Sequence, residues 1–338
     1  MEQHTLTEPL VEATNVKKYY PITRGILLRR VFGHIKAVDG VTLSIHRGEV
    51  FGLVGESGSG KTTLARILSG VTKPTEGEVI FNSLKINQAK GRLLRQLRRE
   101  IGFIYQNPYL SLDPRKTVFD IVSEPLRVHG YEGSIVERVL QLLATVGLRP
   151  EDIQKYPHMF SGGQRQRIVI ARALALSPQF VIADEPTSSL DVSVQAKIIN
   201  LLKDVRNRFN LTILIISHDL SVVRQISDRV GVMYLGKMVE LGAADKVLLT
   251  PLHPYTHVLV SCIPVPEPTV MRSRQIKIEG ELSYSTYSSS GCIYAHRCPL
   301  ATEKCRRVEP ELEWAQEDHM VACHYWRNMT QNNVLQTP

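Results

Sequence analysis

The stretch Gly55-Glu-Ser-Gly-Ser-Gly-Lys-Thr62 decides the fold of this chain. It follows an apolar run over residues 50–54, and a helix is expected to begin near Lys61. A glycine-rich turn between a strand and a helix lets backbone N–H groups converge on phosphate oxygens at the positive end of the helix. Lys61 is then expected to reach the β- and γ-phosphates of a nucleotide, and the Thr62 hydroxyl to bind Mg²⁺. A flexible loop without a ligand is disfavoured by this strand-and-helix context.

The residues expected around the phosphates form one continuous set. They are Gly55, Glu56, Ser57, Gly58, Ser59, Gly60, Lys61, Thr62 and Thr63. Below, residues 55–62 are called the phosphate loop.

Two acids end a second apolar run, which covers residues 180–183. Such a run is typical of a central parallel strand covered on both faces, so Asp184 and Glu185 are expected at its carboxyl end, where α/β sheets bind ligands. We expect Asp184 to bind Mg²⁺, directly or through a water, and Glu185 to act as general base on the attacking water. The alternative is a pair of solvated acids that opens a turn before Pro186.

A serine-glycine-glycine-glutamine segment, Ser161, Gly162, Gly163 and Gln164, precedes this strand. It opens a predicted helix over residues 168–176, so a hydroxyl and bare amides lie at a helix N-terminus and offer a second phosphate site. The alternative is an ordinary serine N-cap. The phosphate loop already supplies one phosphate site, so residues 161–164 would be a second one. With both segments, the chain resembles the ATP-binding subunits of ABC transporters. In that family this signature closes over the γ-phosphate bound by the partner subunit.

The resemblance implies roles for four further residues, in the family's order along the chain. Tyr20 matches the aromatic side chain that stacks on adenine. Gln106 matches the glutamine that touches Mg²⁺ or its water and transmits the nucleotide state to membrane subunits. Asp191 matches the loop that crosses the dimer, and His218 matches the histidine that contacts the γ-phosphate and helps to orient Glu185. The implied cofactors are ATP and Mg²⁺.

The expected fold is α/β, with a P-loop NTPase (RecA-like) core, an antiparallel β subdomain, an inserted helical subdomain at about residues 107–165 and a small Cys-rich C-terminal extension. Residues 1 to about 90 are predicted to form short strands, with prolines such as Pro125 breaking the helices that follow. Residues 1–258 are assigned to the nucleotide-binding domain and residues 259–338 to the extension. The 338 residues are 43% hydrophobic, which is ample for a domain of this size plus an appendage.

No apolar stretch approaches the roughly 18 to 20 residues that a membrane-crossing helix needs. The N-terminus is polar and does not resemble a signal peptide. We therefore expect a cytosolic chain, bound peripherally at the cytoplasmic face of the membrane.

The net charge of +8 raises the alternative of a nucleic-acid binder. Arginines cluster at Arg92, Arg95, Arg98 and Arg99, where helical spacing puts most of them on one face. A single-strand binder would interleave aromatic residues with these charges, and none is present. We expect a solvated helix face and no nucleic-acid partner.

Four of the five cysteines lie close together near the end of the chain, at Cys292, Cys298, Cys305 and Cys323. A segment this small builds little hydrophobic core of its own, so a disulfide bond or a bound metal is expected to stabilise it. A disulfide is disfavoured in a reducing cytosol. Four thiolates can hold Zn²⁺, although the C-x2-C spacing of zinc ribbons is missing. They can also hold an iron-sulfur cluster, which tolerates wider spacings.

The tail also resembles the C-terminal region of the oligopeptide, dipeptide and nickel importer ATPases. The resemblance rests on the segments His253-Pro-Tyr-Thr256, Gly291-Cys292, Arg297-Cys298-Pro299 and Val321-Ala-Cys323. It implies a [4Fe-4S] cluster held by the four cysteines, with Zn²⁺ as the alternative.

The function implied is ATP hydrolysis that powers a binding-protein-dependent importer of di- and oligopeptides. The implied partners are a second ATPase subunit, usually a paralogue, two transmembrane permease subunits and an extracytoplasmic solute-binding protein. Nickel or oligosaccharide import by the same ATPase is an alternative. A soluble ABC ATPase acting on ribosomes or DNA is another, disfavoured because tandem nucleotide domains and long coiled coils are not seen.

Overall fold

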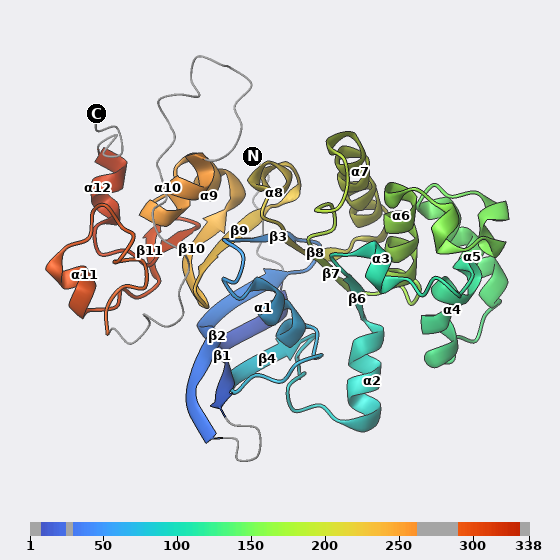
Figure 1. The fold of residues 1–338 in the computed structure, drawn as a ribbon, viewed down its shortest axis with the longest axis horizontal. Helices are drawn as coiled ribbons and strands as arrows, with labels where there is room; N and C mark the ends of the chain where they lie inside the picture. Colours follow the sequence, from blue (N-terminus) through green and yellow to red (C-terminus); the bar gives the residue numbers. More distant parts are fainter. Residues whose placement is uncertain (1–7, 25–29, 262–289, 332–338) are drawn as a thin grey trace.

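The computed structural model describes residues 8–24, 30–261 and 290–331 of the chain (Figure 1). Cys262 lies outside these residues, and all statements below concern the described part.

The described strands form two sheets: a four-stranded sheet in the order β2-β1-β4-β5 and an eight-stranded sheet in the order β11-β12-β10-β9-β3-β8-β7-β6. Their bounds are β1 (Pro9–Arg24), β2 (Arg30–His46), β3 (Val50–Val54), β4 (Glu76–Phe81), β5 (Leu84–Lys85), β6 (Ile101–Ile104), β7 (Phe180–Asp184), β8 (Thr212–Ile216), β9 (Arg229–Tyr234), β10 (Lys237–Ala243), β11 (Glu313–Gln316) and β12 (His319–Val321).

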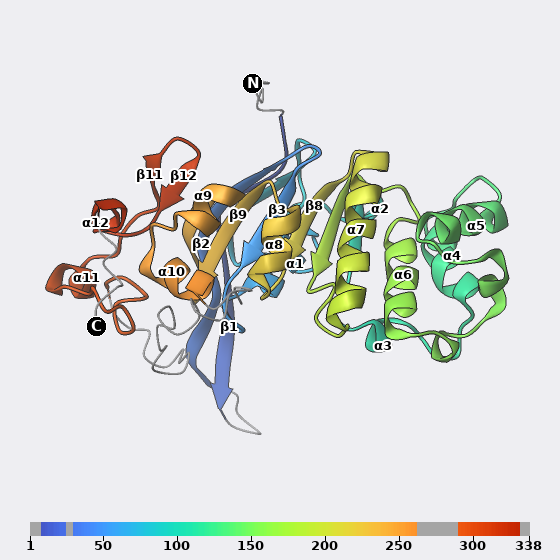
Figure 2. The ribbon, with the colours of Figure 1, turned by 90° about the horizontal axis from the view of Figure 1, so that it is seen from above.

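The helices separate into three groups along the molecule, with α3 to α6 at one end and α10 to α12 at the other (Figures 1 and 2). Their bounds are α1 (Lys61–Leu68), α2 (Gly91–Arg99), α3 (Pro108–Ser111), α4 (Val118–Val128), α5 (Ile135–Thr145), the 3-10 helices η1 (Pro150–Gln154) and η2 (Pro157–Met159), α6 (Gly162–Ala173), α7 (Val192–Phe209), α8 (Leu220–Ile226), α9 (Ala244–Leu249), α10 (Pro254–Ser261), α11 (Glu303–Arg307) and α12 (Trp326–Gln331).

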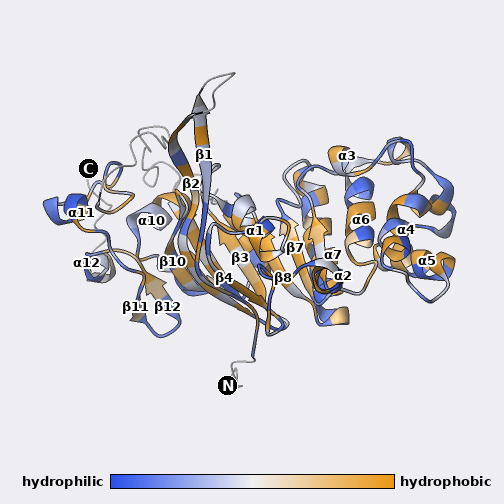
Figure 3. Cartoon of the chain, turned by 90° about the horizontal axis from the view of Figure 1, so that it is seen from below, coloured by the Kyte–Doolittle hydropathy of each residue, from blue (hydrophilic) through white to orange (hydrophobic). Residues whose placement is uncertain are grey.

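The apolar runs form the centre of the large sheet, as the sequence predicts. Every residue of β3, β7 and β8 is buried, and β8 pairs in parallel with both β3 and β7. The hydrophobic colouring of these strands is continuous in Figure 3. Because all three are parallel, their carboxyl ends meet at one edge of the sheet and bring the following loops together.

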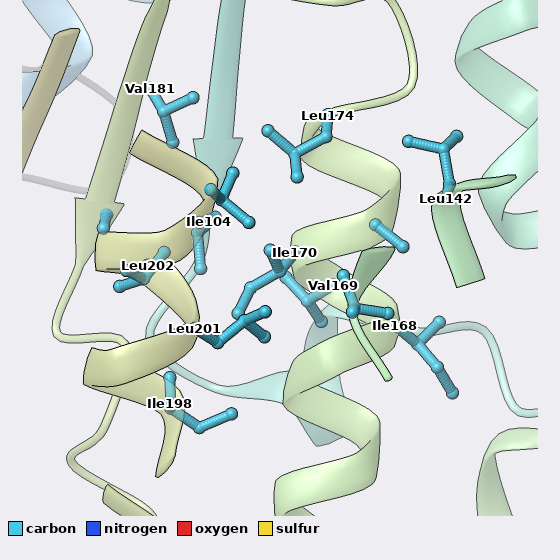
Figure 4. Close-up of a cluster of buried hydrophobic side chains, with 14 of the residues drawn as sticks. Ile104, Leu142, Ile168, Val169, Ile170, Leu174, Val181, Ile198, Leu201 and Leu202 are labelled. Carbon is cyan, nitrogen blue, oxygen red and sulfur yellow. The ribbon is translucent and has the colours of Figure 1, made fainter. Parts of the chain in front are cut away.

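One face of the sheet edge is covered by α6 and α7. Figure 4 shows Ile170 of α6 and Leu174, which caps the end of that helix, with Leu201 and Leu202 of α7 beside Val181 of β7, all within one buried cluster. This packing fixes where α6 begins, and therefore where the serine-glycine-glycine-glutamine segment lies.

Three predictions about the elements are wrong. The first strands are long rather than short: β1 has 16 residues and β2 has 17, and together they form a ribbon that projects beyond the sheet (Figure 2). The helix expected over residues 168–176 already begins at Gly162 and ends at Ala173, ahead of Pro178, which cannot continue it. Pro125 lies inside α4 instead of ending it.

The end of the chain joins the large sheet. β12 pairs with β10, and β11 pairs with β12, so the C-terminal residues extend the sheet that carries the phosphate loop. Glu240 and His319 lie across this junction, fully buried, with the His319 Nε2 atom 2.7 Å from the carboxylate. No helix within the described ranges is both long and apolar enough to span a bilayer.

Candidate active site

The phosphate loop connects β3 to α1 as predicted. Gly55, Gly58 and Gly60 have positive φ values of 147°, 81° and 103°, which side chains rarely tolerate. A Cβ at Gly60 would lie 2.0 Å from the carbonyl oxygen of Ala37. The turn between β9 and β10 contacts the phosphate loop, because the Gly236 N–H donates to the Ser59 carbonyl at 2.9 Å.

Lys61 is buried inside this loop. Its Nζ donates to the carbonyl oxygens of Gly55 at 2.7 Å and of Glu56 at 2.8 Å, and to the Ser59 hydroxyl at 3.2 Å. Burial lowers the pKa of Lys61, and nearby carboxylates partly oppose that shift. Within the described part of the chain, the ammonium group of Lys61 thus donates to neutral oxygens, which an arriving phosphate can replace.

The predicted magnesium ligands lie together. The Thr62 hydroxyl is 3.2 Å from Asp184 Oδ1, so one cation can contact both oxygens. Burial, the largest cause, raises the pKa of Asp184; the Thr62 bond lowers it and the Glu185 charge raises it. A bound divalent cation would favour the charged carboxylate and offset the cost of its burial.

Glu185 follows directly at the end of β7 and is held from two sides. Gln106 Nε2 donates to its Oε2 atom at 2.7 Å, and His218 Nδ1 lies 3.4 Å from the same oxygen. Gln106 follows β6 and His218 follows β8, so three neighbouring parallel strands supply this group. The carboxylate is thus oriented, while its other oxygen remains available to a water.

Thr62, Gln106 and Asp184 line one cleft with a volume of about 710 Å³. Its outer wall includes Arg66 and Arg172. Thr62 is its one lining residue from the phosphate loop, and the cleft extends from there toward Arg98, Arg99 and His129. Its positively charged lining suits an anion.

The serine-glycine-glycine-glutamine segment forms the start of α6. Ser161 is an exposed N-cap: its Oγ accepts from the Gln164 N–H at 3.4 Å, and its own N–H donates to Gln164 Oε1 at 3.0 Å. A Cβ at Gly163 would lie 2.4 Å from Val194 Cγ1, so this glycine allows α6 to approach α7.

Other predicted site residues lie at the surface near these elements. Ser57 and Gly58 are exposed in the phosphate loop, Glu56 is half-buried, and Thr63 is half-buried on α1. Asp191 is the exposed N-cap of α7.

Tyr20 lies on β1 and is 40% exposed, with the Lys18 ammonium 5.3 Å from the centre of its ring. Its neighbour Tyr19 points instead to Asp39, to which its hydroxyl donates. Tyr20 is therefore the accessible ring of the pair.

The four cysteines surround one small cavity with a volume of about 20 Å³. Burial raises the pKa of the Cys292 thiol to about 11 and that of Cys323 to about 12, and it also raises the pKa of Cys298. Within the described ranges, no three His, Cys, Asp or Glu side chains form a group able to hold a metal ion. The cavity has room for about one water. The four thiols therefore line one cavity, but their positions do not fit the predicted [4Fe-4S] cluster.

The sequence analysis missed two residues that contact the phosphate loop, Tyr255 and Arg297, and a third, Tyr234, that contacts Arg297. The Glu56 N–H donates to the Tyr255 hydroxyl at 2.8 Å, and Arg297 Nη1 donates to the Glu56 carboxylate at 3.0 Å and to the Tyr234 hydroxyl at 3.3 Å. Arg297 follows Glu56 by 241 residues, so no local pattern links them.

Comparisons with known proteins agree with this geometry. Residues 38–188 match the family model described as ABC transporter, and residues 239–305 match that of the oligopeptide/dipeptide transporter C-terminal region. The oligopeptide transport ATP-binding protein AppF of Bacillus subtilis (strain 168) is 49% identical over 324 residues, covering 94% of this chain and 98% of that protein. The dipeptide transport ATP-binding protein DppF of Haemophilus influenzae is 44% identical over 321 residues, covering 94% and 97%.

Among solved structures, the dimeric post-hydrolysis state of the ATP-binding cassette MJ0796 bound to ADP and Pi is 34% identical, with a TM-score of 0.61. The match covers 69% of this chain and 98% of that one. The α/β fold with its phosphate loop is therefore that of an ABC ATPase. With identities of 43–49% over more than nine-tenths of its length, the chain belongs to the family of oligopeptide and dipeptide ABC transporter ATP-binding proteins.

Proposed function

We propose that this chain hydrolyses ATP to power a binding-protein-dependent importer of di- and oligopeptides. One observation carries the catalytic part: Thr62 with Asp184, and Gln106 with Glu185 and His218, lie at the carboxyl ends of adjacent parallel strands. These are the groups that phosphoryl transfer to water requires.

The proposed reaction begins with the triphosphate in the phosphate loop. Lys61 neutralises the β- and γ-phosphates, and Thr62 and Asp184 would hold Mg²⁺, which would supply positive charge to stabilise the developing negative charge. The oxygen of the attacking water bonds to the γ-phosphorus, and Glu185 takes a proton from that water. The bond to the β-γ bridging oxygen breaks, and ADP and phosphate leave. Gln106 and His218 orient the base.

The signature at residues 161–164 and Asp191 act in a second chain. This assignment is supported by the related cassette MJ0796, which is dimeric. We propose that each ATP lies between the phosphate loop of one subunit and the signature of its partner, which is a paralogue or a second copy. Tyr20 stacks on the adenine.

The cargo and the remaining partners are inferred from the relatives. AppF and DppF are named for oligopeptide and dipeptide transport, which favours short peptides over nickel or an oligosaccharide. The chain would then act at the cytoplasmic face of the membrane with two permease subunits and an extracytoplasmic solute-binding protein. The movement that couples hydrolysis to transport passes through Gln106 and the helices that follow it.

Reconstitution tests this proposal. The chain, its partner ATPase and the permease subunits are placed in vesicles with the solute-binding protein, and uptake of labelled dipeptide, nickel and oligosaccharide is measured. We expect ATP-dependent uptake of the dipeptide, abolished by Lys61→Ala. ATP hydrolysis without uptake of any solute, or co-purification with ribosomes or DNA in detergent, would favour the soluble alternative.

We also propose that the four cysteines bind a [4Fe-4S] cluster, with Zn²⁺ as the alternative. Four thiols around one buried cavity support it, although the cavity must widen to admit any cluster. Thiols in such a site lose their protons when a metal binds. Iron, sulfide and zinc analysis of protein purified without oxygen tests the proposal, and metal-free, normally folded protein would refute it.

A further inference from the structure

The phosphate loop is held by residues from far along the chain. Its second residue, Glu56, makes two contacts to distant segments. The backbone N–H donates to Tyr255 of α10, and the carboxylate pairs with Arg297, which lies beside Cys298. Both contacts belong to the part of the chain that matches the oligopeptide/dipeptide C-terminal model, not to the ABC model.

Arg297 is positioned firmly. Its side chain is only 10% exposed, it donates to the Tyr234 hydroxyl, and its guanidinium lies 5.8 Å from the centre of the Tyr234 ring. The Tyr234 ring in turn packs against Tyr255 at 4.6 Å and against Tyr294 at 5.2 Å between ring centres. These three tyrosines are buried, so their packing restricts the movement of the Arg297 guanidinium.

The negative charges of Glu56 and of a bound phosphate explain why the position of Arg297 matters. Glu56 puts a carboxylate into a loop whose ligand carries several negative charges, and like charges at this range oppose binding. Burial lowers the pKa of Lys61, and the carboxylates of Glu185, Asp184 and Glu56 oppose this, which places Glu56 within electrostatic reach of the phosphate-binding lysine. The adjacent Arg297 guanidinium compensates the Glu56 charge.

We propose that Arg297 and Tyr255 form part of the nucleotide site as positioning residues that act through Glu56. Arg297 neutralises the Glu56 carboxylate, and Tyr255 accepts the Glu56 N–H and so fixes the backbone at the start of the phosphate loop. The inference rests on the proposed function, because it assumes that the phosphate loop binds ATP. It makes the C-terminal region a component of the nucleotide site.

The test measures the affinity of the full chain for Mg-ATP by calorimetry in a series of variants. Arg297→Ala should weaken binding roughly tenfold, the effect of one unpaired charge a few ångströms from the ligand. Arg297→Lys should retain most of the affinity, and Tyr255→Phe should weaken it by a smaller factor. The matched control is Arg307→Ala, which removes an arginine paired with Glu303 at the surface of the same region.

The decisive variant combines Glu56→Gln with Arg297→Ala. Since it removes the carboxylate together with its partner, affinity should return to within about threefold of the wild type. A purely structural role of Arg297 would leave the double variant as weak as Arg297→Ala. Glu56→Gln alone should bind at least as tightly as the wild type, and this variant decides the matter should Arg297→Ala not fold.

The outcomes separate this inference from the proposed function. If Lys61→Ala binds ATP like the wild type, the phosphate loop is not the site and the proposed function fails. If Lys61→Ala loses binding but Arg297→Ala does not, or if the double variant is not restored, only the role of Arg297 is overturned.

Discussion

Glu185 has an unusual backbone for a residue with a side chain. Its φ is 48°, in the left-handed region, while its N–H donates to the Ile216 carbonyl at 2.9 Å. Such conformations cost about 1–3 kcal/mol and persist where the surroundings enforce them. Here the turn aims the carboxylate at Gln106 and His218, so its orientation is set without a nucleotide.

Glu185→Gln should abolish hydrolysis and preserve ATP binding. The amide keeps the shape of the side chain but cannot take a proton, so phosphate release should fall by a factor of about 10² to 10⁴. Release is followed with a coupled phosphate assay, and ATP binding is measured on the same sample. Glu303→Gln, on exposed α11, serves as the control. Wild-type turnover in Glu185→Gln would remove Glu185 from the role of base.

His253 makes folding sensitive to acid. It is 1% exposed, its Nδ1 accepts from the Tyr255 N–H at 3.1 Å, and burial lowers its pKa from 6.5 to about 3, with a smaller contribution from His257. Because the unfolded chain binds the proton more readily, stability should fall as the pH drops below about 6.5, by up to about 1.4 kcal/mol per pH unit.

The loss between pH 7 and pH 5, measured by urea unfolding, should be smaller in His253→Asn, which keeps an acceptor for the Tyr255 N–H but cannot be protonated. An equal loss in both proteins would assign the acid sensitivity to other groups.

At the scale of elements, the contact between α6 and α7 depends on one glycine. Gly163→Ala puts a Cβ 2.4 Å from Val194 Cγ1, which forces the two helices apart. We expect a loss of about 1–3 kcal/mol in unfolding free energy. Thermal unfolding measures it. The same Cβ lies 3.8 Å from Val194 Cβ, so Gly163→Ala with Val194→Ala should regain stability relative to Gly163→Ala alone. Failure to regain any would contradict this packing explanation.

Helices and strands were predictable where a short stretch of sequence carries a clear pattern of apolar residues. The apolar runs that form β3 and β7 lie where the sequence predicts. The length of β1 and β2 was not predictable, because residues such as Ile22 and Val31 are exposed and polar residues interrupt any regular alternation. Pairing along the ribbon decides its extent.

At the scale of the molecule, the C-terminal region is bound to the core by a buried contact between Glu240 and His319. Glu240 accepts from the N–H groups of Leu252 and His253 and from His319. His319→Ala removes one partner of a fully buried carboxylate, which should cost about 3 kcal/mol. Thermal unfolding and hydrogen exchange in β12 measure this. His324→Ala, which loses only a contact to the Val308 carbonyl, should cost less than about 1 kcal/mol. Equal losses in the two variants would contradict the role of the pair.

The amino-acid sequence by itself determined the phosphate loop between β3 and α1 and the pair of acids at the end of β7, because glycine spacing and apolar runs act through neighbours in the chain. The bond from Gln106 to Glu185, the cavity that gathers the cysteines and the pairing of Arg297 with Glu56 were decided only by the tertiary structure. Each of these joins segments that are distant in the chain, and which of them meet depends on how the whole sheet orders its strands and packs its helices.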